Sequence, residues 1–273
     1  MNSLVQRLLT AAVLIPIVVW FVMFSPDMAF ISILSLIIII AAYEWGALSG
    51  LKSKFEKYVL AAVTLLLAHG LTVLSLDVTH YLMYTSLFFW TLVIVFIIVK
   101  PQFLLELNIQ RPLMLLLGII VVSFTFVSLC QIRFGFVYGP DLLMYLLLLI
   151  WIADSGAFFA GRLFGKHKLS PVISPGKSIE GVIGGLLACL VFAYFSAGYF
   201  AVENNAIFIL LSLYIAFVSV FGDLFESLMK RRANVKDSGA ILPGHGGILD
   251  RIDSLIAAAP VFVASVLLTE IFS

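Results

Sequence analysis

Charge is the scarcest property of this sequence. Of its 273 residues only 11% are Asp, Glu, Lys or Arg, whereas 63% are hydrophobic. A soluble domain usually carries about 25% charged residues. So few charges are unable to cover a surface with groups that water solvates. The composition therefore excludes an ordinary soluble protein and indicates that lipid surrounds much of the chain.

CxxC motifs, internal repeats and low-complexity stretches are also missing from the sequence. The two cysteines, Cys130 and Cys189, lie inside apolar runs and lack CxxC spacing. We therefore predict that both are small core residues without a redox role. Many apolar runs follow the first one, which indicates a retained span and not a cleaved signal peptide. We expect no nucleic-acid partner.

Long apolar segments fill the chain instead. A bilayer core of about 30 Å needs roughly 20 apolar residues per helix. We predict nine such helices, at residues 8–24, 28–48, 58–76, 81–99, 112–132, 141–164, 179–200, 206–229 and 252–271. These runs are too long and continuous for barrel strands. The expected fold class is all-α, a polytopic integral membrane protein with about nine transmembrane helices.

The basic residues predict an orientation. All 16 Lys and Arg residues except Arg133 fall at the N-terminus or in loops on one side of the predicted helices. The positive-inside rule then places the N-terminus in the cytoplasm and the C-terminus on the opposite side. The expected location is the cell inner (plasma) membrane, with the chain crossing it several times.

Polar residues divide the chain unequally. The first five predicted helices contain Glu44 as their main ionisable group, whereas polar residues and glycines enter the helices from Asp141 onward. We predict a transmembrane scaffold or oligomer interface at residues 1–140. The catalytic region, with four helices and cytoplasmic loops, is predicted at residues 141–273.

A dense block of charge at residues 221–254 is the candidate site. Its first part has polar residues at spacing i, i+3, i+4 and i+7: Asp223, Glu226, Ser227 and Lys230. This spacing places them on one helix face. The simpler interpretation is a polar face toward a neighbouring helix. Charges at membrane depth, however, usually face a cavity or pathway, which favours a functional role.

Two further carboxylates, Asp250 and Asp253, begin the ninth predicted helix at spacing i, i+3. Hard cations such as Mg²⁺ prefer carboxylate oxygens and leave room for substrate phosphates. A helix cap would explain Asp250 alone, but not both residues together with Asp223. We hypothesise that Asp223, Asp250 and Asp253 hold Mg²⁺, with room for a second cation.

The loop between these helices suits an anion. Lys230, Arg231 and Lys236 are candidate ligands for phosphate oxygens. The glycine-rich stretch at residues 243–247 lets backbone N–H groups approach an anion, and it leads into a helix N-terminus. Within it, His245 either donates to a phosphate or only fixes the turn.

A second loop on the same side contains a Gly-Lys-Ser triplet preceded by Ser174. It is not a P-loop, because Pro171 stands where the first glycine is required and no strand is expected before it. Ser178 is predicted to cap the seventh helix, with Glu180 in its first turn. Lys177 is a candidate phosphate ligand.

Asp154 lies in the sixth predicted helix among small residues, and Gly181 and Gly185 form a GxxxG pair in the seventh. Small residues let helices approach closely in lipid. Asp154 is either a buried hydrogen-bonded acid of this packing or a wall of the nucleotide or metal pocket, and we favour the wall. We expect the remaining histidines to be interfacial, without ligand-like partners: His69, His80 and His167.

Carboxylates for metal, cationic residues and an anion-binding loop suit phosphoryl or nucleotidyl transfer at the cytoplasmic membrane face. Residues 227–253 read SxxKR, KDxG and LPGHGGxxDRxD in turn. This pattern resembles the signature of the phosphatidate cytidylyltransferase (CDP-diacylglycerol synthase) family without a departure. The Asp154 helix and the loop at residues 174–180 are similar too.

The resemblance implies that CTP and phosphatidic acid give CDP-diacylglycerol and pyrophosphate in phospholipid biosynthesis. It also implies Mg²⁺ dependence and a homodimer in membrane lipid. We assign catalytic roles to Asp223, Lys230, Arg231, Lys236, Asp250 and Asp253. We assign substrate binding to Asp154, Ser174, Lys177, Ser227, Asp237, His245, Gly246, Gly247 and Arg251.

Two other functions fit parts of the pattern. A CTP-dependent polyprenol or dolichol kinase has a related design, but it transfers the γ-phosphate and releases CDP. A secondary transporter would use buried acids for ion coupling, but transporters usually show paired repeats and broken helices at the midplane. The polar groups of this sequence gather at one membrane face, which favours the transferase.

Overall fold

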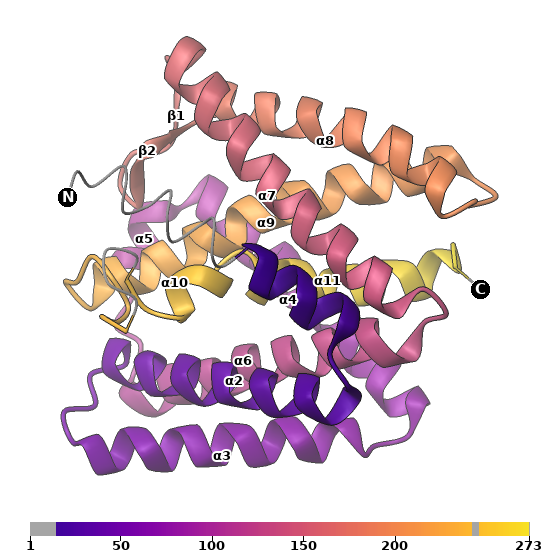
Figure 1. Ribbon diagram of the computed structural model, residues 1–273. Helices are drawn as coiled ribbons and strands as arrows, with labels where there is room; N and C mark the ends of the chain where they lie inside the picture. Colours follow the sequence, from indigo (N-terminus) through magenta and orange to yellow (C-terminus); the bar gives the residue numbers. More distant parts are fainter. Residues whose placement is uncertain (1–14, 242–245, 273) are drawn as a thin grey trace.

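A computed structural model describes residues 15–241 and 246–272 of the chain. In this part of the chain nearly every element is a helix (Figure 1). The long helices are α2 (Asp27–Leu48), α3 (Lys54–Thr72), α4 (Leu76–Val99), α6 (Arg111–Gly135), α7 (Gly139–Phe164), α8 (Ile179–Tyr199), α9 (Asn205–Arg232) and α11 (Leu255–Thr269). The shorter elements are α5 (Pro101–Glu106), β1 (Lys168–Ser170), β2 (Ser174–Ser178) and α10 (Leu249–Ile252).

The helices confirm the expected fold class. Eight helical stretches in the described residues are long and apolar enough to cross a membrane. The eighth of them combines α10 and α11 as Leu249–Thr269. The shorter apolar helix Ile15–Phe24 lies within the first predicted span, whose residues 8–14 are outside the described part. About nine helices were predicted, and the structure agrees.

Three local features differ from the prediction. The short helix α5 follows α4 with a proline at its start, where no element was expected. A two-stranded antiparallel hairpin pairs Lys168 with Ser178 and Ser170 with Ser174. The expectation that no strand precedes the Gly-Lys-Ser triplet was therefore wrong. The ninth span is also split, because a turn at residues 253–254 separates α10 from α11.

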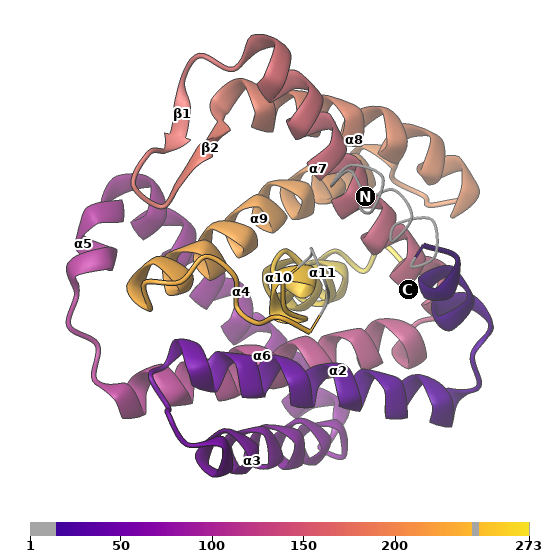
Figure 2. The ribbon, with the colours of Figure 1, turned by 60° about the vertical axis from the view of Figure 1, so that its left-hand side comes forward.

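Helices α9 and α11 form the centre of the molecule. Figures 1 and 2 show them between a layer of α2, α3 and α6 and a second layer of α7 and α8. In the most hydrophobic stretch of each span, 61% of residues are buried for α9 and for Leu249–Thr269, against 22% for α3. The two spans that carry the charged block are thus shielded by the outer helices.

The outer helices present apolar side chains outward. Leu66 of α3, Phe88 of α4 and Phe195 of α8 are among the exposed large hydrophobic residues. Such a surface is unfavourable in water and suits the hydrocarbon of a bilayer. Cys189 is buried, Cys130 is half-buried and both are free thiols, as predicted.

Small residues join α7 to α8, as the GxxxG pair predicted. A Cβ atom added to Gly156 would lie 3.0 Å from the Gly185 Cα, and one added to Gly181 would lie 2.9 Å from the Ala157 carbonyl oxygen. Any larger side chain would push the two backbones apart. This close pair fixes the position of the hairpin, which connects the cytoplasmic ends of α7 and α8 in the predicted topology.

Candidate active site

The polar residues near the end of α9 interact along one helix face, as their spacing predicts. The Ser227 hydroxyl donates to Oδ1 of Asp223 at 3.2 Å. One turn later, the Lys230 ammonium is ion-paired with Glu226, whose side chain is fully buried. The Lys230 side chain itself remains 15% exposed. Lys230 therefore extends the polar face of α9 toward the loop that follows.

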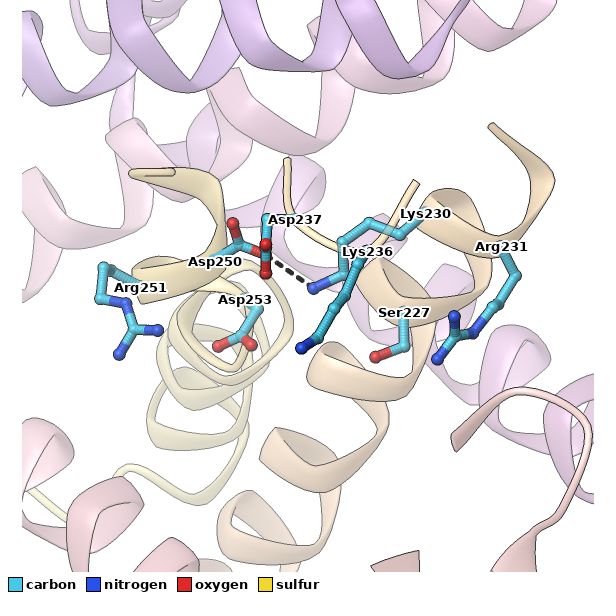
Figure 3. A pocket seen from close by; sticks show the side chains of 8 residues that line it. All are labelled: Ser227, Lys230, Arg231, Lys236, Asp237, Asp250, Arg251 and Asp253. Atoms are coloured by element: carbon cyan, nitrogen blue, oxygen red, sulfur yellow. Dashed lines mark hydrogen bonds and ion pairs between the residues drawn. The ribbon is translucent and has the colours of Figure 1, made fainter. Parts of the chain in front are cut away.

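Asp250 connects that loop to α9. Its Oδ1 is paired with Nζ of Lys230 at 2.6 Å (Figure 3). Its Oδ2 accepts from the backbone N–H of Ser238 at 2.9 Å and of Gly247 at 2.8 Å, and from the Ser238 hydroxyl at 2.9 Å. Gly246 has a left-handed φ of 78°, and a Cβ there would lie 2.5 Å from Oδ2. The glycine of the motif thus makes room for the carboxylate.

A polar cavity of about 280 Å³ opens beside this ion pair. Figure 3 shows Lys236, Asp253 and Ser227 pointing into the same space. The cavity is lined by Ser227, Lys230, Arg231, Lys236, Asp237, Asp250, Arg251 and Asp253. All of these residues were predicted to belong to the site. Three lysine or arginine residues from α9 and its loop suit a polyanion such as a triphosphate.

A second, larger cavity of about 780 Å³ runs along the membrane-embedded helices. Its walls include Val22 of the helix Ile15–Phe24, Leu34 of α2, and Leu147 and Trp151 of α7. At its polar end lie Asp154, Ser155, Asp223, Asp250, Arg251 and Asp253. Apolar walls that end in charged groups suit an amphipathic ligand with hydrocarbon chains and an ionic head.

The two cavities meet at a common wall. Asp250, Arg251 and Asp253, all from α10 and the turn after it, line both spaces. The split of the ninth span therefore has a consequence for the site, because it places these side chains between a polar and an apolar compartment. Two ligands of different solubility would meet here.

Asp223 and Asp154 lie at the apolar side of that wall. Nζ of Lys177 is 2.7 Å from Oδ2 of Asp223 and donates to the Val220 carbonyl at 3.2 Å. Asp253 interacts electrostatically with Asp223, Lys177 and Asp154. Asp154 thus lines the larger, apolar cavity and not the polar one, and its role as a wall of a nucleotide or metal pocket stays a prediction. Lys177 contacts a carboxylate, and its role as a phosphate ligand stays a prediction.

The hairpin is tied to the site from two directions. Besides the Lys177 pair, Nε of Arg231 donates to the Ile173 carbonyl at 3.3 Å. The predicted cap is confirmed, since the Ser178 hydroxyl accepts from the Gly181 N–H at 3.1 Å. Glu180 in the first turn of α8 contacts Nδ1 of His167 at 2.6 Å. His167 therefore has a partner, contrary to expectation.

The remaining predicted residues are placed less centrally. Ser174 begins β2 and lines neither cavity. Gly247 contributes its backbone N–H to Asp250 and does not line either cavity. His245 lies outside the described residues. The roles of these residues in binding substrate stay predictions.

The acids fit a cation that is shared with a ligand. Within residues 15–241 and 246–272, no group of three or more His, Cys, Asp or Glu side chains is arranged as a complete metal site. Both oxygens of Asp250 have protein partners, and so do both oxygens of Asp223, which contact Ser227 and Lys177. Mg²⁺, however, is usually bound through one or two carboxylates together with substrate phosphates. Asp223 and Asp253, which line one cavity, supply such a set.

Sequence reasoning missed Glu44, which contacts the site from α2, in the part of the chain predicted to be a scaffold. Its carboxylate on α2 is 3% exposed and accepts from the Leu249 N–H at 2.8 Å and the Ser238 hydroxyl at 3.0 Å. The available signal was a single acid inside an otherwise apolar span, because buried charges in membrane helices are costly. Its partners, more than 190 positions away in the chain, were beyond the reach of local patterns.

The geometry of the site indicates a class of protein. Cationic side chains and carboxylates stand at the junction of a polar and a largely apolar cavity, within a bundle of helices that are long and apolar enough to span a membrane. Such a site suits an enzyme that joins a water-soluble anion to a lipid.

The chain belongs to the cytidylyltransferase family, whose model matches residues 5–269. It is a nucleotidyltransferase, and its resemblance to the phosphatidate cytidylyltransferases is confirmed by its relatives.

Three relatives illustrate the likeness. The phosphatidate cytidylyltransferase of Pseudomonas aeruginosa is 36% identical over 261 residues, which cover 95% of both chains. That of Haemophilus influenzae is 55% identical over 130 residues, or 46% of this chain and 45% of the relative. That of Staphylococcus haemolyticus is 46% identical over 148 residues, or 50% of this chain and 56% of the relative. The matches thus span about half of two relatives and nearly all of the third.

Proposed function

We propose that the protein transfers the cytidylyl group of CTP to phosphatidic acid, giving CDP-diacylglycerol and pyrophosphate. The observation that carries the proposal is the common wall of the two cavities at Asp250, Arg251 and Asp253. The polar cavity suits the triphosphate of CTP, and the apolar cavity suits a lipid with its phosphate at the acidic end. Relatives named phosphatidate cytidylyltransferase support the choice of substrates.

The reaction is a displacement at phosphorus. A phosphate oxygen of the lipid attacks the α-phosphorus of CTP and forms a new P–O bond. The bond from the α-phosphorus to the bridging oxygen breaks, and pyrophosphate leaves with that electron pair. The lipid phosphate dianion is already nucleophilic, so the protein does not need to supply a strong general base. Its tasks are to position the two substrates and to offset their negative charge.

The basic side chains perform the second task. Lys236, Arg231 and Lys230 line the polar cavity and would contact the triphosphate oxygens, on which negative charge increases as pyrophosphate leaves. Asp250 holds Lys230 in place. Asp223 and Asp253 would hold a magnesium ion together with phosphate oxygens, and the ion would supply Lewis-acid stabilisation of the transferred group.

The finer parts of the proposal concern the setting of the reaction. The distribution of Lys and Arg supports a site at the cytoplasmic face of the inner membrane. A water-soluble nucleotide would enter there, while the lipid would arrive laterally from the bilayer. The proposal that the protein forms a homodimer rests on the family resemblance alone.

An assay with purified protein in detergent micelles tests the proposal. With CTP, Mg²⁺ and phosphatidic acid, we expect equal amounts of pyrophosphate and CDP-diacylglycerol. Diacylglycerol, which lacks the phosphate nucleophile, should give no product. Release of CDP in place of pyrophosphate would assign the protein to the kinase class. No release with any nucleoside triphosphate would contradict an enzymatic role.

A further inference from the structure

We propose that Glu44 is a positioning residue that fixes the loop of the polar cavity from the opposite half of the molecule. The proposal rests on the proposed function only in naming CTP as the ligand of that cavity. Glu44 lines neither cavity. It acts through the backbone and side chain of residues that do hold the cavity together.

The first argument is the set of donors around the carboxylate. Oε1 of Glu44 accepts from the Ile248 N–H at 3.1 Å, and Oε2 accepts from the Leu249 N–H at 2.8 Å. Oε2 also accepts from the Ser238 hydroxyl at 3.0 Å. The two N–H groups belong to the start of α10, where backbone donors have no partner within the helix. A single side chain thus satisfies donors from both parts of the loop.

The second argument is the shape of the loop around Glu44. A Cβ atom added to Gly239 would lie 2.2 Å from Oε1, and one added to Gly247 would lie 2.4 Å from both carboxylate oxygens. Both glycines therefore leave the space that the carboxylate fills. The loop is complementary to Glu44 in shape as well as in hydrogen bonding, which a merely solvated acid would not require.

The third argument is the connection to Asp250. The Ser238 hydroxyl that contacts Glu44 also lies 2.9 Å from Oδ2 of Asp250, which is paired with Lys230. One hydroxyl proton donates to only one of the two carboxylates at a time. Ser238 therefore links Glu44 to the ion pair at the edge of the polar cavity. A change at Glu44 would therefore alter the hydrogen bonding of Asp250, and with it the Asp250–Lys230 ion pair, through Ser238.

The fourth argument is the rigid support of Glu44 itself. Its neighbour Trp45 is 1% exposed, donates from Nε1 to the Met114 carbonyl of α6 at 2.8 Å and stacks on Phe225 of α9. These contacts attach α2 to two other helices at the level of Glu44. The carboxylate is thus held at a fixed position relative to α9, from which Lys230 and Arg231 extend.

The variant Glu44→Gln tests this role. Glutamine has a similar size, but one of its oxygens is replaced by an NH₂ group that would face the Ile248 or Leu249 donor. Hydrogen exchange measured by mass spectrometry should show faster exchange of these two amides, while amides in the middle of α11 keep their wild-type rates. We expect the Kd for CTP and its KM to rise about tenfold, while the KM for phosphatidic acid changes less than twofold.

The matched control is Glu56→Gln, which removes the same charge from an exposed position on α3. It should leave the amide exchange, the Kd and both KM values unchanged. Ser238→Ala, which removes the hydroxyl shared by Glu44 and Asp250 and retains the backbone donors, should raise the Kd for CTP less than Glu44→Gln. It provides the test if Glu44→Gln does not fold. Combined, the two changes should weaken CTP binding by less than the product of their separate effects.

A simple loss of folded protein gives a different pattern. It would lower kcat in proportion to the active fraction and leave every KM and Kd unchanged. That pattern, or wild-type exchange of the Ile248 and Leu249 amides in Glu44→Gln, would overturn the positioning role. Failure of the wild-type protein to form pyrophosphate would contradict the proposed function instead, because CTP binding and amide exchange are measured without turnover.

Discussion

Asp250 organises the site through both of its oxygens. Oδ1 neutralises Lys230, and Oδ2 accepts donors from Ser238 and Gly247 at the two parts of the loop. Its side chain is only 7% exposed and that of Lys230 is 15% exposed. Neutralising Asp250 would leave Lys230 with one carboxylate partner fewer, although Glu226 remains. It would also take a charged acceptor from the Ser238 and Gly247 donors, which destabilises a buried network.

The variant Asp250→Asn should therefore impair both stability and activity. We expect a loss of about 3 kcal/mol in the free energy of unfolding and a fall of at least about 100-fold in kcat/KM for CTP. Thermal unfolding in detergent and steady-state kinetics measure the two effects. Wild-type activity of this variant at ordinary Mg²⁺ concentration would contradict its assigned role.

Asp223 and Asp253 should control the response to magnesium. Each supplies one carboxylate to the proposed ion, so Asp223→Asn and Asp253→Asn should each raise the Mg²⁺ concentration for half-maximal activity about tenfold or more. Lys236→Gln is the control, since it should raise the KM for CTP without changing the Mg²⁺ response. Activity titrations over Mg²⁺ concentration measure this. Unchanged responses in both aspartate variants would remove them from the metal site.

Most residues of the site were predictable from the sequence, because they lie close together in it. Every side chain that lines the polar cavity comes from the charged block between Asp223 and Asp253. Glu44 was not predicted as part of the site, because its contacts depend on how α2 packs against the loop. Ser238 was missed for a related reason, since its hydroxyl has a role only once Glu44 and Asp250 lie on either side of it.

At the scale of elements, Gly222 sets how closely α9 approaches the ninth span. A Cβ atom at Gly222 would lie 2.7 Å from the carbonyl oxygen of Asp253 and 3.1 Å from that of Ser254. These carbonyls belong to the turn between α10 and α11. The contact therefore holds the common wall of the two cavities against the helix that carries Asp223.

The variant Gly222→Ala should separate these elements. Because the added methyl group meets backbone atoms, we expect a destabilisation of about 1–3 kcal/mol and a marked fall in kcat. Gly198→Ala in α8 is the matched control, since nothing lies within 4 Å of its added Cβ. It should stabilise the helix by up to about 1 kcal/mol and leave activity intact. Equal effects of the two changes on unfolding and kinetics would contradict the account.

Hydropathy predicted the long helices but not the short elements. The apolar runs set the spans, because a helix is the structure that satisfies the backbone in lipid. The hairpin at residues 168–178 contains turn and polar residues without a strand-like alternation, and its pairing depends on the positions of α7 and α8. The turn at residues 253–254 falls on Asp253 and Ser254, at the polar start of the ninth span, where hydropathy does not distinguish a turn from the first turn of a helix. The turn depends on packing, because its carbonyls lie against Gly222.

For the whole molecule, the distribution of Lys and Arg predicts the orientation in the membrane. Single cysteines at exposed positions test it in a Cys130→Ala, Cys189→Ala background. Lys54→Cys, at the start of α3, should be protected from an impermeant thiol reagent in intact cells. Val137→Cys, 88% exposed between α6 and α7, should react. Both should react in permeabilised membranes, and the reverse pattern in intact cells would contradict the orientation.

The fold places a polar cavity and an apolar cavity side by side at α10. Helices α9 and α11 are enclosed by the other spans. The apolar cavity is lined mainly by the helix Ile15–Phe24, α2, α6 and α7, and it leads to the acids near the charged loop. A lipid would keep its chains in an apolar environment while its phosphate reaches the cations of the polar cavity. The two substrates would thus stay in separate cavities until they meet at α10.

The kinetics of one variant in each cavity wall measure whether the two substrates bind separately. Lys236→Gln changes the polar cavity, and Leu147→Trp fills part of the apolar one. With CTP and phosphatidic acid varied independently in mixed micelles, Lys236→Gln should raise the KM for CTP about tenfold and leave that for the lipid within twofold. Leu147→Trp should show the opposite selectivity. If both variants changed the same KM, or neither changed any, the two cavities would not hold the two substrates separately.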